Sequence, residues 1–263
     1  MTREHVLVEA EPPRGRLVLN RPERRNALSL DAMREVTSAL EELSTTTGVA
    51  VIVVEARGPA FSAGHDIAEM VGRDPEFYDQ LFTQCTAMMQ AIHGVSQPVI
   101  AKVAGVATAA GCQLVASCDL VVASQRATFA TPGVRIGLFC TTPMVPVTKA
   151  VGRKRAMEML LTGEPIDAST AMAWGLVNRV VPPEQLDAAV DHLVDQITRW
   201  SPDVIGIGKA AFYRQVDLPE DDAYDLTQPI MAANAALDDA QEGFDAFLGK
   251  RDPLWSQQAG ATS

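Results

Sequence analysis

Two hydrophobic patterns alternate along the first two hundred residues. After Ser29, apolar side chains recur at helical spacing as far as residue 43, and Ser29 is a favourable helix N-cap with Asp31 in the first turn. Gly48 ends this pattern. The next segment, residues 49–55, is a run rich in β-branched residues, which is typical of a strand buried on both faces of a parallel sheet.

The same succession of elements occurs twice. The strand at 49–55 leads through a loop of small residues, 58–66, into a short helix at 67–70. A second strand at 98–103 leads through another small-residue loop, 104–111, into a helix that starts at residue 112. Two strand–loop–helix units in tandem predict an α/β fold with a superhelical repeat. Further strands are predicted at 16–20, 121–123 and 127–130.

Helical patterns dominate the second half of the chain, and we predict no further strands after about residue 182. We predict helices at 142–151, 154–161, 183–199, 203–214, 219–237 and 240–248. The 263 residues exceed a typical domain without reaching two. We therefore expect an α/β core over residues 1–200 and a C-terminal helical region over residues 201–263.

Composition narrows the possible partners. The chain is 47% hydrophobic and 21% charged, which is typical of a globular protein. Its 22 Lys and Arg against 33 Asp and Glu give a formal net charge of −11. Such an acidic protein is not expected to bind nucleic acid or an anionic membrane surface. A few local cationic side chains and backbone N–H groups can still hold a small phosphorylated ligand.

The cysteines and the apolar segments bear on location. No metal-type spacing relates the four cysteines, and a core of this size needs no disulfide, so we expect no metal site and a reducing, cytoplasmic setting. The first residues contain no apolar stretch of signal-peptide length. The most apolar region, 98–124, is interrupted by polar residues and is too short for a membrane span.

Small residues precede two predicted helix starts, around His65 and around Ala110. Backbone N–H groups at a helix start have no partner within the helix, and small residues allow a ligand oxygen to approach them. Two such groups that converge would form an oxyanion hole, which stabilises charge on a carbonyl oxygen. The alternative is that both segments are simply close-packed turns.

Four motifs carry a resemblance to a known family. They are residues 19–28, residues 61–70, residues 105–114 with Cys118-Asp-Leu120, and residues 242–251. In this order and at these intervals they resemble the signatures of the crotonase superfamily, the enoyl-CoA hydratase/isomerase family. The resemblance covers nearly the whole chain. It implies a crotonase-like spiral of ββα units whose C-terminal helical region associates into a homotrimer or a dimer of trimers.

The resemblance also implies a ligand and the residues that bind it. The ligand is an acyl-CoA thioester, and no cofactor is expected beyond its coenzyme A moiety. The backbone N–H groups of His65 and Ala110 correspond to the two donors of the oxyanion hole. The positions that match the family's coenzyme A contacts are Arg24, Arg25, Ala63, Asp66, Ile67, Phe244 and Lys250, the last two often from a neighbouring subunit.

Two positions depart from the pattern of the family's hydratases, which use a pair of glutamates. Gln113 and Gly133 occupy those positions here. An amide has no useful basicity near neutral pH and glycine offers only room, so efficient hydration is not expected. Cys140 and the His65 imidazole could act in the acyl pocket instead. Cys140 could equally be a small buried hydrophobe, and His65 could be retained only for its backbone N–H.

Three hypotheses follow for function. The leading one is an enzyme of the enoyl-CoA hydratase/isomerase family, nominally a lyase, that stabilises a thioester enolate. A second is an acyl-CoA binding protein without catalysis. The third keeps the fold as an enzyme with different chemistry, such as double-bond isomerisation, decarboxylation or thioester cleavage.

Overall fold

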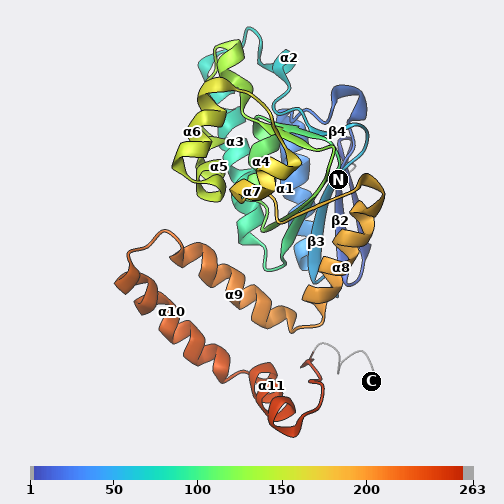
Figure 1. Cartoon of the computed structure of the whole chain (residues 1–263), viewed down its shortest axis with the longest axis vertical. Coiled ribbons are helices and arrows are strands. Elements are labelled where there is room, and N and C mark those ends of the chain that lie inside the picture. Colours follow the sequence, from blue (N-terminus) through green and yellow to red (C-terminus); the bar gives the residue numbers. More distant parts are fainter. Residues whose placement is uncertain (1–2, 257–263) are drawn as a thin grey trace.

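The computed structural model describes residues 3–256, in which two sheets are built from repeated strand–strand–helix units (Figure 1). Both strands of the N-terminal hairpin join a six-stranded sheet. In the next three strand pairs of the chain, the first strand joins this sheet and the second joins a smaller four-stranded sheet. The six-stranded sheet has the order β1 (Val6–Glu11), β2 (Arg14–Leu19), β3 (Val51–Ala56), β5 (Val99–Val103), β7 (Leu120–Ser124), β10 (Arg179–Val181). The four-stranded sheet has the order β4 (Ala60–Ser62), β6 (Val106–Thr108), β8 (Thr128–Ala130), β9 (Ile166–Asp167).

Most strand pairs are parallel, because a helix connects one unit to the next. Only the β1–β2 hairpin and the β8–β9 pair are antiparallel among the described strands. The helices of the core are α1 (Leu30–Thr45), α2 (Ile67–Met70), α3 (Pro75–Gly94), α4 (Ala110–Ser117), α5 (Met144–Val151), α6 (Arg153–Thr162), α7 (Ala168–Trp174) and α8 (Leu186–Thr198).

Strand β3 shows why its sequence is apolar throughout. Val51 and Val53 pack with residues of α8 on one face of the six-stranded sheet. Ile52 and Val54 point to the other face and pack in the main core with α1, α3 and α4. A strand covered on both faces needs apolar residues at successive positions, so the predicted double-sided burial of this strand is confirmed.

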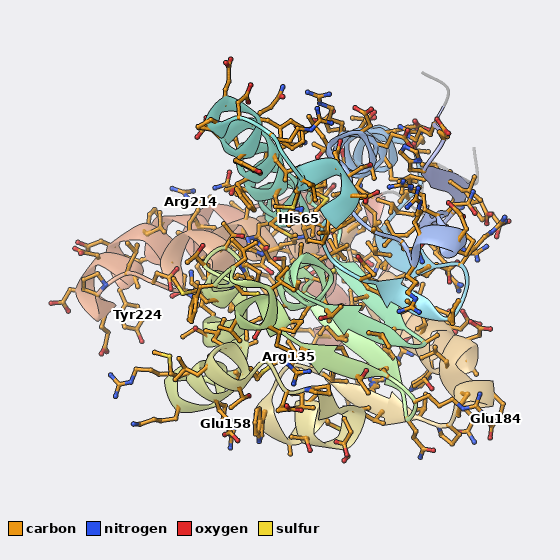
Figure 2. All side chains as sticks on the ribbon, turned by 90° about the horizontal axis from the view of Figure 1, so that it is seen from above. His65, Arg135, Glu158, Glu184, Arg214 and Tyr224 are labelled. Carbon is orange, nitrogen blue, oxygen red and sulfur yellow. The ribbon has the colours of Figure 1, made fainter. Side chains whose placement is uncertain are left out.

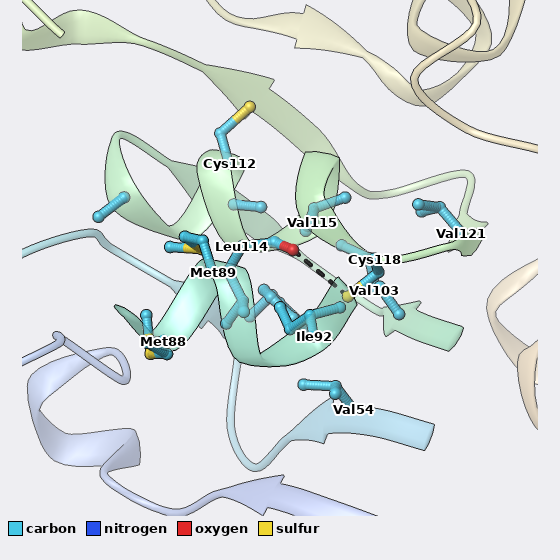
Figure 3. Packing of buried hydrophobic residues seen from close by; sticks show 14 of the residues in the cluster. Val54, Met88, Met89, Ile92, Val103, Cys112, Leu114, Val115, Cys118 and Val121 are labelled. Atoms are coloured by element: carbon cyan, nitrogen blue, oxygen red, sulfur yellow. Dashed lines mark hydrogen bonds between the residues drawn. The ribbon is translucent and has the colours of Figure 1, made fainter. Parts of the chain in front are cut away.

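Buried cysteine and methionine side chains pack around α4 (Figure 3). Cys112 lies near the start of α4, and Cys118 directly follows its end. The Cys118 thiol donates to the carbonyl of Leu114 at 3.3 Å. Met88 and Met89 of α3 pack below α4. All four cysteines are free and buried.

Three C-terminal helices extend from the core (Figure 1): α9 (Pro202–Gln215), α10 (Glu220–Ala235) and α11 (Asp238–Gly249). Lys209 fixes α9 to the core, because its Nζ donates to the carbonyls of Ile92 and Gln97 at 2.8 Å and to Asp119 at 2.7 Å. The Tyr213 hydroxyl donates to the other oxygen of Asp119 at 2.7 Å. One carboxylate therefore binds two side chains of the same helix.

The predicted α/β class and the spiral of ββα units are confirmed, but some local predictions were wrong. The loops at 58–66 and 104–111 contain β4 and β6, whose pairing creates the second sheet, and α4 begins at Ala110 rather than at 112. Strands β1, β9 and β10 were not predicted. Residues 257–263 of the expected C-terminal region lie outside the described residues. Within residues 3–256, none of the helices has the length and apolar character needed to cross a membrane.

Candidate active site

A cavity of about 530 Å³ opens where the first two units meet. Most of its wall is apolar, with Phe82, Ile136, Leu138 and Phe139 among the lining residues. The structure brings six residues singled out from the sequence to this one cavity: Ala63, His65, Ile67, Ala110, Gly133 and Cys140. Apolar walls with few polar groups are typical of ligand sites.

The turn that carries His65 lies against the start of α4. A Cβ atom on Gly64 would stand 3.2 Å from the backbone nitrogen of Ala110 and 2.8 Å from the Ala109 Cβ. Gly64 has φ +87° and Ala109 has φ 50°, so both turns use backbone conformations that side chains disfavour. Such paired, strained turns are a frequent feature of binding sites.

The two backbone N–H groups at this junction are unpaired. Ala110 is the first residue of α4, and its N–H has no partner in the helix. His65 lies opposite Leu28 in an isolated β-bridge. The two hydrogen bonds of this bridge run from the Leu28 N–H to the Gly64 carbonyl and from the Asp66 N–H to the Leu28 carbonyl, so the His65 N–H takes no part in them. Within residues 3–256, neither N–H donates to a protein acceptor. Both therefore remain available to a ligand oxygen.

Glycine makes the close approach of the two units possible. A Cβ on Gly111 would lie 2.4 Å from the Ser62 carbonyl oxygen, and one on Gly105 would lie 2.1 Å from that of Pro59. The Ser62 hydroxyl donates to the carbonyl of Asn26 and accepts from the N–H of Gly64. The small residues noted in the sequence thus bring two backbones together and lock the turn.

Gly133 is tightly enclosed, so the expectation that it offers room was wrong. A Cβ at this position would lie 2.0 Å from the carbonyl oxygen of Leu138 and 2.8 Å from the Cys140 thiol. The Leu138 N–H also donates to the Gly133 carbonyl at 3.0 Å. The segment after Gly133 folds back over it and fills the space that a longer side chain would need.

Burial favours the uncharged forms of two ionisable side chains of the cavity. It lowers the pKa of His65 and outweighs the opposing influence of the Leu28 backbone. The His65 ring meets Phe82 edge-on with the ring centroids 5.4 Å apart, and neither ring nitrogen has a partner in hydrogen-bond geometry within residues 3–256. Burial raises the pKa of the Cys140 thiol. Arg135 also lines the cavity and pairs with Glu164. No carboxylate is among the described lining residues.

Gln113 lies one helical turn beyond Ala110 and lines a neighbouring cavity instead of this one. Its side chain is buried, and its Oε1 is 3.7 Å from the thiol of Cys85. Burial raises the pKa of Cys85 to about 12, so this thiol keeps its proton and is the donor. The sequence placed Gln113 in the same pocket as Gly133 and Cys140, whereas the structure separates it from them.

The charged loop lies beside the cavity. Arg24 and Arg25 are exposed, and the carbonyl of Arg25 accepts from the N–H of Ala63 at 3.0 Å. Asp66 is paired with Arg21 at 3.3 Å, and both side chains are largely covered. Arg21 was missed in the sequence, where it is one of several arginines. Its second contact, to the carbonyl of Ala27, shows that it holds this loop against the start of α2.

Phe244 and Lys250 lie far from the cavity of their own chain. Phe244 lies within α11 and Lys250 directly follows this helix, which is at the opposite pole of the molecule from α2 (Figure 1). In Figure 2, which looks down the long axis of the molecule, Tyr224 of α10 lies at the edge while His65 lies nearer the centre. Only a second copy could bring this pair to the cavity without a rearrangement.

Comparison with known proteins gives this geometry its context. The family model described as enoyl-CoA hydratase/isomerase matches residues 15–258. The chain belongs to this family. A mouse relative named enoyl-CoA hydratase domain-containing protein 3, mitochondrial, is 47% identical over 245 residues, which is 91% of this chain and 80% of the relative.

Solved structures agree with this assignment. The crystal structure of an enoyl-CoA hydratase from Mycobacterium smegmatis has a TM-score of 0.93 at 44% identity and covers 96% of this chain and 99% of its own. The crystal structure of human enoyl Coenzyme A hydratase domain-containing protein 3 has a TM-score of 0.93 at 43% identity. The match covers 96% of this chain and 100% of the human one.

The comparisons also correct the predicted location. We expected a cytoplasmic protein from the cysteines and from the first residues of the chain. The mouse and human relatives, each 47% identical to this chain, are named as mitochondrial proteins. The cytoplasmic prediction was therefore wrong, because free buried cysteines are compatible with either compartment.

Proposed function

We propose that this member of the enoyl-CoA hydratase/isomerase family binds an acyl-CoA thioester in the 530 Å³ cavity and polarises its carbonyl with the N–H groups of His65 and Ala110. The observation that carries the proposal is that both unpaired donors line this cavity and lie close together, since a Cβ on Gly64, the residue before His65, would be 3.2 Å from the Ala110 nitrogen. One such donor typically contributes about 3–4 kcal/mol to stabilising a developing oxyanion. Deprotonation at Cα would place that charge on the thioester oxygen, as an enolate.

Fast hydration of an enoyl thioester is not part of this proposal. Hydration requires a group that activates water and a group that delivers a proton, and each typically contributes about 10²–10⁴-fold. The described cavity wall has no carboxylate, Gly133 cannot carry a side chain without backbone movement, and Gln113 lines another cavity. These features disfavour hydration. Decarboxylation is compatible with them, because loss of CO₂ leaves the electron pair on the enolate without a protein base, whereas isomerisation would need the neutral His65 imidazole to move the proton.

For the nucleotide part of the ligand, we propose that the exposed Arg24 and Arg25 supply local positive charge in a protein of net charge −11. Ala63, Asp66 and Ile67 lie on the same side of the cavity mouth, with Asp66 oriented by Arg21. Phe244 and Lys250 would reach this region from a second copy in a trimer or pair of trimers. Support comes from the apolar surface of α11, where Phe247 is 83% exposed.

A second candidate is an acyl-CoA binding protein without catalysis. It is favoured by the side chains of the cavity, since no carboxylate is among the described lining residues, burial keeps the Cys140 thiol protonated, and burial weakens the basicity of the His65 imidazole. An enolate forms either when a base removes a Cα proton or when a Cα carboxylate is lost as CO₂. Binding requires only the apolar wall and the two N–H donors.

One experiment separates the two candidates. The pure protein is incubated with hexanoyl-CoA in D₂O, and the NMR signal of the Cα protons is followed. The proposed enzyme exchanges these protons faster than the solution without protein, whereas a binding protein saturates with hexanoyl-CoA and leaves them unchanged. If hexanoyl-CoA does not bind at all, both candidates are wrong.

A further inference from the structure

A second cavity of about 480 Å³ lies beside the first, between α3, α4, α5 and α9. Thr142 lines both cavities, so the two approach each other at the segment around this residue. Much of the second wall is apolar, and its members include Met89, Ala116, Val145 and Phe212. Its volume is in the range of cavities that hold small organic ligands.

One polar group in this wall has no partner in the protein. Gln113 is 3% exposed, and its amide oxygen is engaged by the protonated thiol of Cys85. This contact fixes the amide orientation, so that the Nε2 group is left as the free end. No hydrogen bond from Nε2 is found within residues 3–256. Nε2 is not among the fully enclosed atoms left without a partner, so it is open to the cavity, where a ligand oxygen can accept its hydrogen bond.

The neighbouring polar side chains are already engaged. The Nε2 of His93 lies 3.0 Å from the carbonyl of Ser117, and its ring stacks on Tyr213 at 3.9 Å. The Tyr213 hydroxyl donates to Asp119. Lys149, at the rim, pairs with Asp217. Burial lowers the pKa of His93, so the interior of this cavity presents neutral groups, which suits an uncharged oxygen better than a carboxylate.

We propose that the second cavity receives the far part of the acyl group and selects acyl chains that carry an oxo or hydroxyl oxygen, which accepts a hydrogen bond from the Gln113 Nε2. This inference rests on the proposed function, because the thioester end must occupy the first cavity. The acyl chain passes Thr142, its methylene groups contact the apolar wall, and its oxygen pairs with the amide. Gln113 thereby determines specificity instead of performing proton transfer.

Calorimetric titration with hexanoyl-CoA and its 3-oxo, 4-oxo and 5-oxo derivatives tests this. At least one oxo derivative should bind about 3- to 10-fold more tightly than hexanoyl-CoA, the gain expected for one hydrogen bond to a neutral acceptor. Gln113→Leu should abolish that preference while binding hexanoyl-CoA at least as tightly. Gln90→Leu is the matched control, because Gln90 lines the same cavity but is exposed to solvent.

A second variant tests the path without touching the buried amide. Val145 lines only the second cavity and is 56% exposed, so Val145→Trp can narrow the cavity while leaving the core intact. It should weaken hexanoyl-CoA binding and leave acetyl-CoA binding unchanged. The proposal is overturned if no oxo derivative is preferred, if the preference survives Gln113→Leu, or if Val145→Trp binds hexanoyl-CoA normally. Failure of every thioester to bind would instead overturn the proposed function.

Discussion

Replacing Gly64 by alanine should disable the oxyanion hole without changing any side chain that lines the cavity. The added methyl would lie 3.2 Å from the Ala110 nitrogen, 3.0 Å from the Thr108 carbonyl oxygen and 2.8 Å from the Ala109 Cβ. Backbone atoms cannot yield as a flexible side chain can. The turn must therefore move, and the N–H of His65 moves with it.

The expected loss follows from the value of one donor. Removing a single oxyanion donor typically costs about 3–4 kcal/mol in the transition state, which corresponds to roughly 10²–10³-fold in rate. The assay is the exchange rate of the Cα protons of hexanoyl-CoA in D₂O, with thermal melting in parallel. We expect Gly64→Ala to lower the exchange rate at least about 10²-fold.

Gly72→Ala is the matched control for this change. Gly72 also has a positive φ, of +70°, but nothing lies within 4 Å of the Cβ that alanine would add. Both variants carry the same kind of backbone strain, about 1–2 kcal/mol, whereas only Gly64→Ala affects the hole. Equal exchange rates in the two variants at comparable stability would refute the reasoning.

Three further predictions concern stability and chemistry. Gly133→Glu should not hydrate crotonyl-CoA, and it should lower the free energy of unfolding in urea by at least about 1–3 kcal/mol, since the new Cβ would lie 2.0 Å from the Leu138 carbonyl oxygen. A folded variant with hydratase activity would contradict this. Lys209→Met should lower the free energy of unfolding by about 3–5 kcal/mol, because it leaves Asp119 without its cation. Lys149→Met removes the cation of an exposed pair and should lower it by less than about 1 kcal/mol, so similar losses in the two variants would contradict this prediction. Burial lowers the pKa of His93 below its ordinary 6.5, so below that pH the unfolded state binds this proton more readily than the folded state and acid favours unfolding. The wild-type protein should therefore lose its higher melting temperature relative to His93→Phe as the pH falls below 6.5, and a difference that stays constant with pH would contradict this.

Local sequence rules predicted the elements with long periodic patterns. The Ser29 cap is confirmed, since its hydroxyl accepts from the N–H of Ala32 at 3.2 Å, and the double-sided strand at 49–55 is confirmed as β3. Both features depend on neighbours in sequence or on burial alone. The short strands β4 and β6 were missed because a strand of three residues is too short to show a hydrophobic period, and their pairing is set by the packing of whole units.

In the candidate site, too, features that depend on neighbouring residues could be predicted and features that depend on distant segments could not. The two backbone donors could be anticipated because small residues before a helix start are visible in the sequence. The surroundings of Gly133 could not, since the carbonyl that closes on it comes from a turn five residues later. The position of Gln113 depends on its contact with Cys85 of another helix, which no spacing in the sequence reports.

The most direct test of the central claim is the carbonyl stretch of a bound thioester, measured by isotope-edited infrared spectroscopy with [1-¹³C]hexanoyl-CoA. Two N–H donors at the oxygen polarise the carbonyl and weaken its double bond. The account predicts a shift to lower wavenumber on binding that persists in Gly72→Ala and is largely lost in Gly64→Ala. A bound thioester whose carbonyl stretch equals that in water, or a shift that survives in Gly64→Ala, would contradict it.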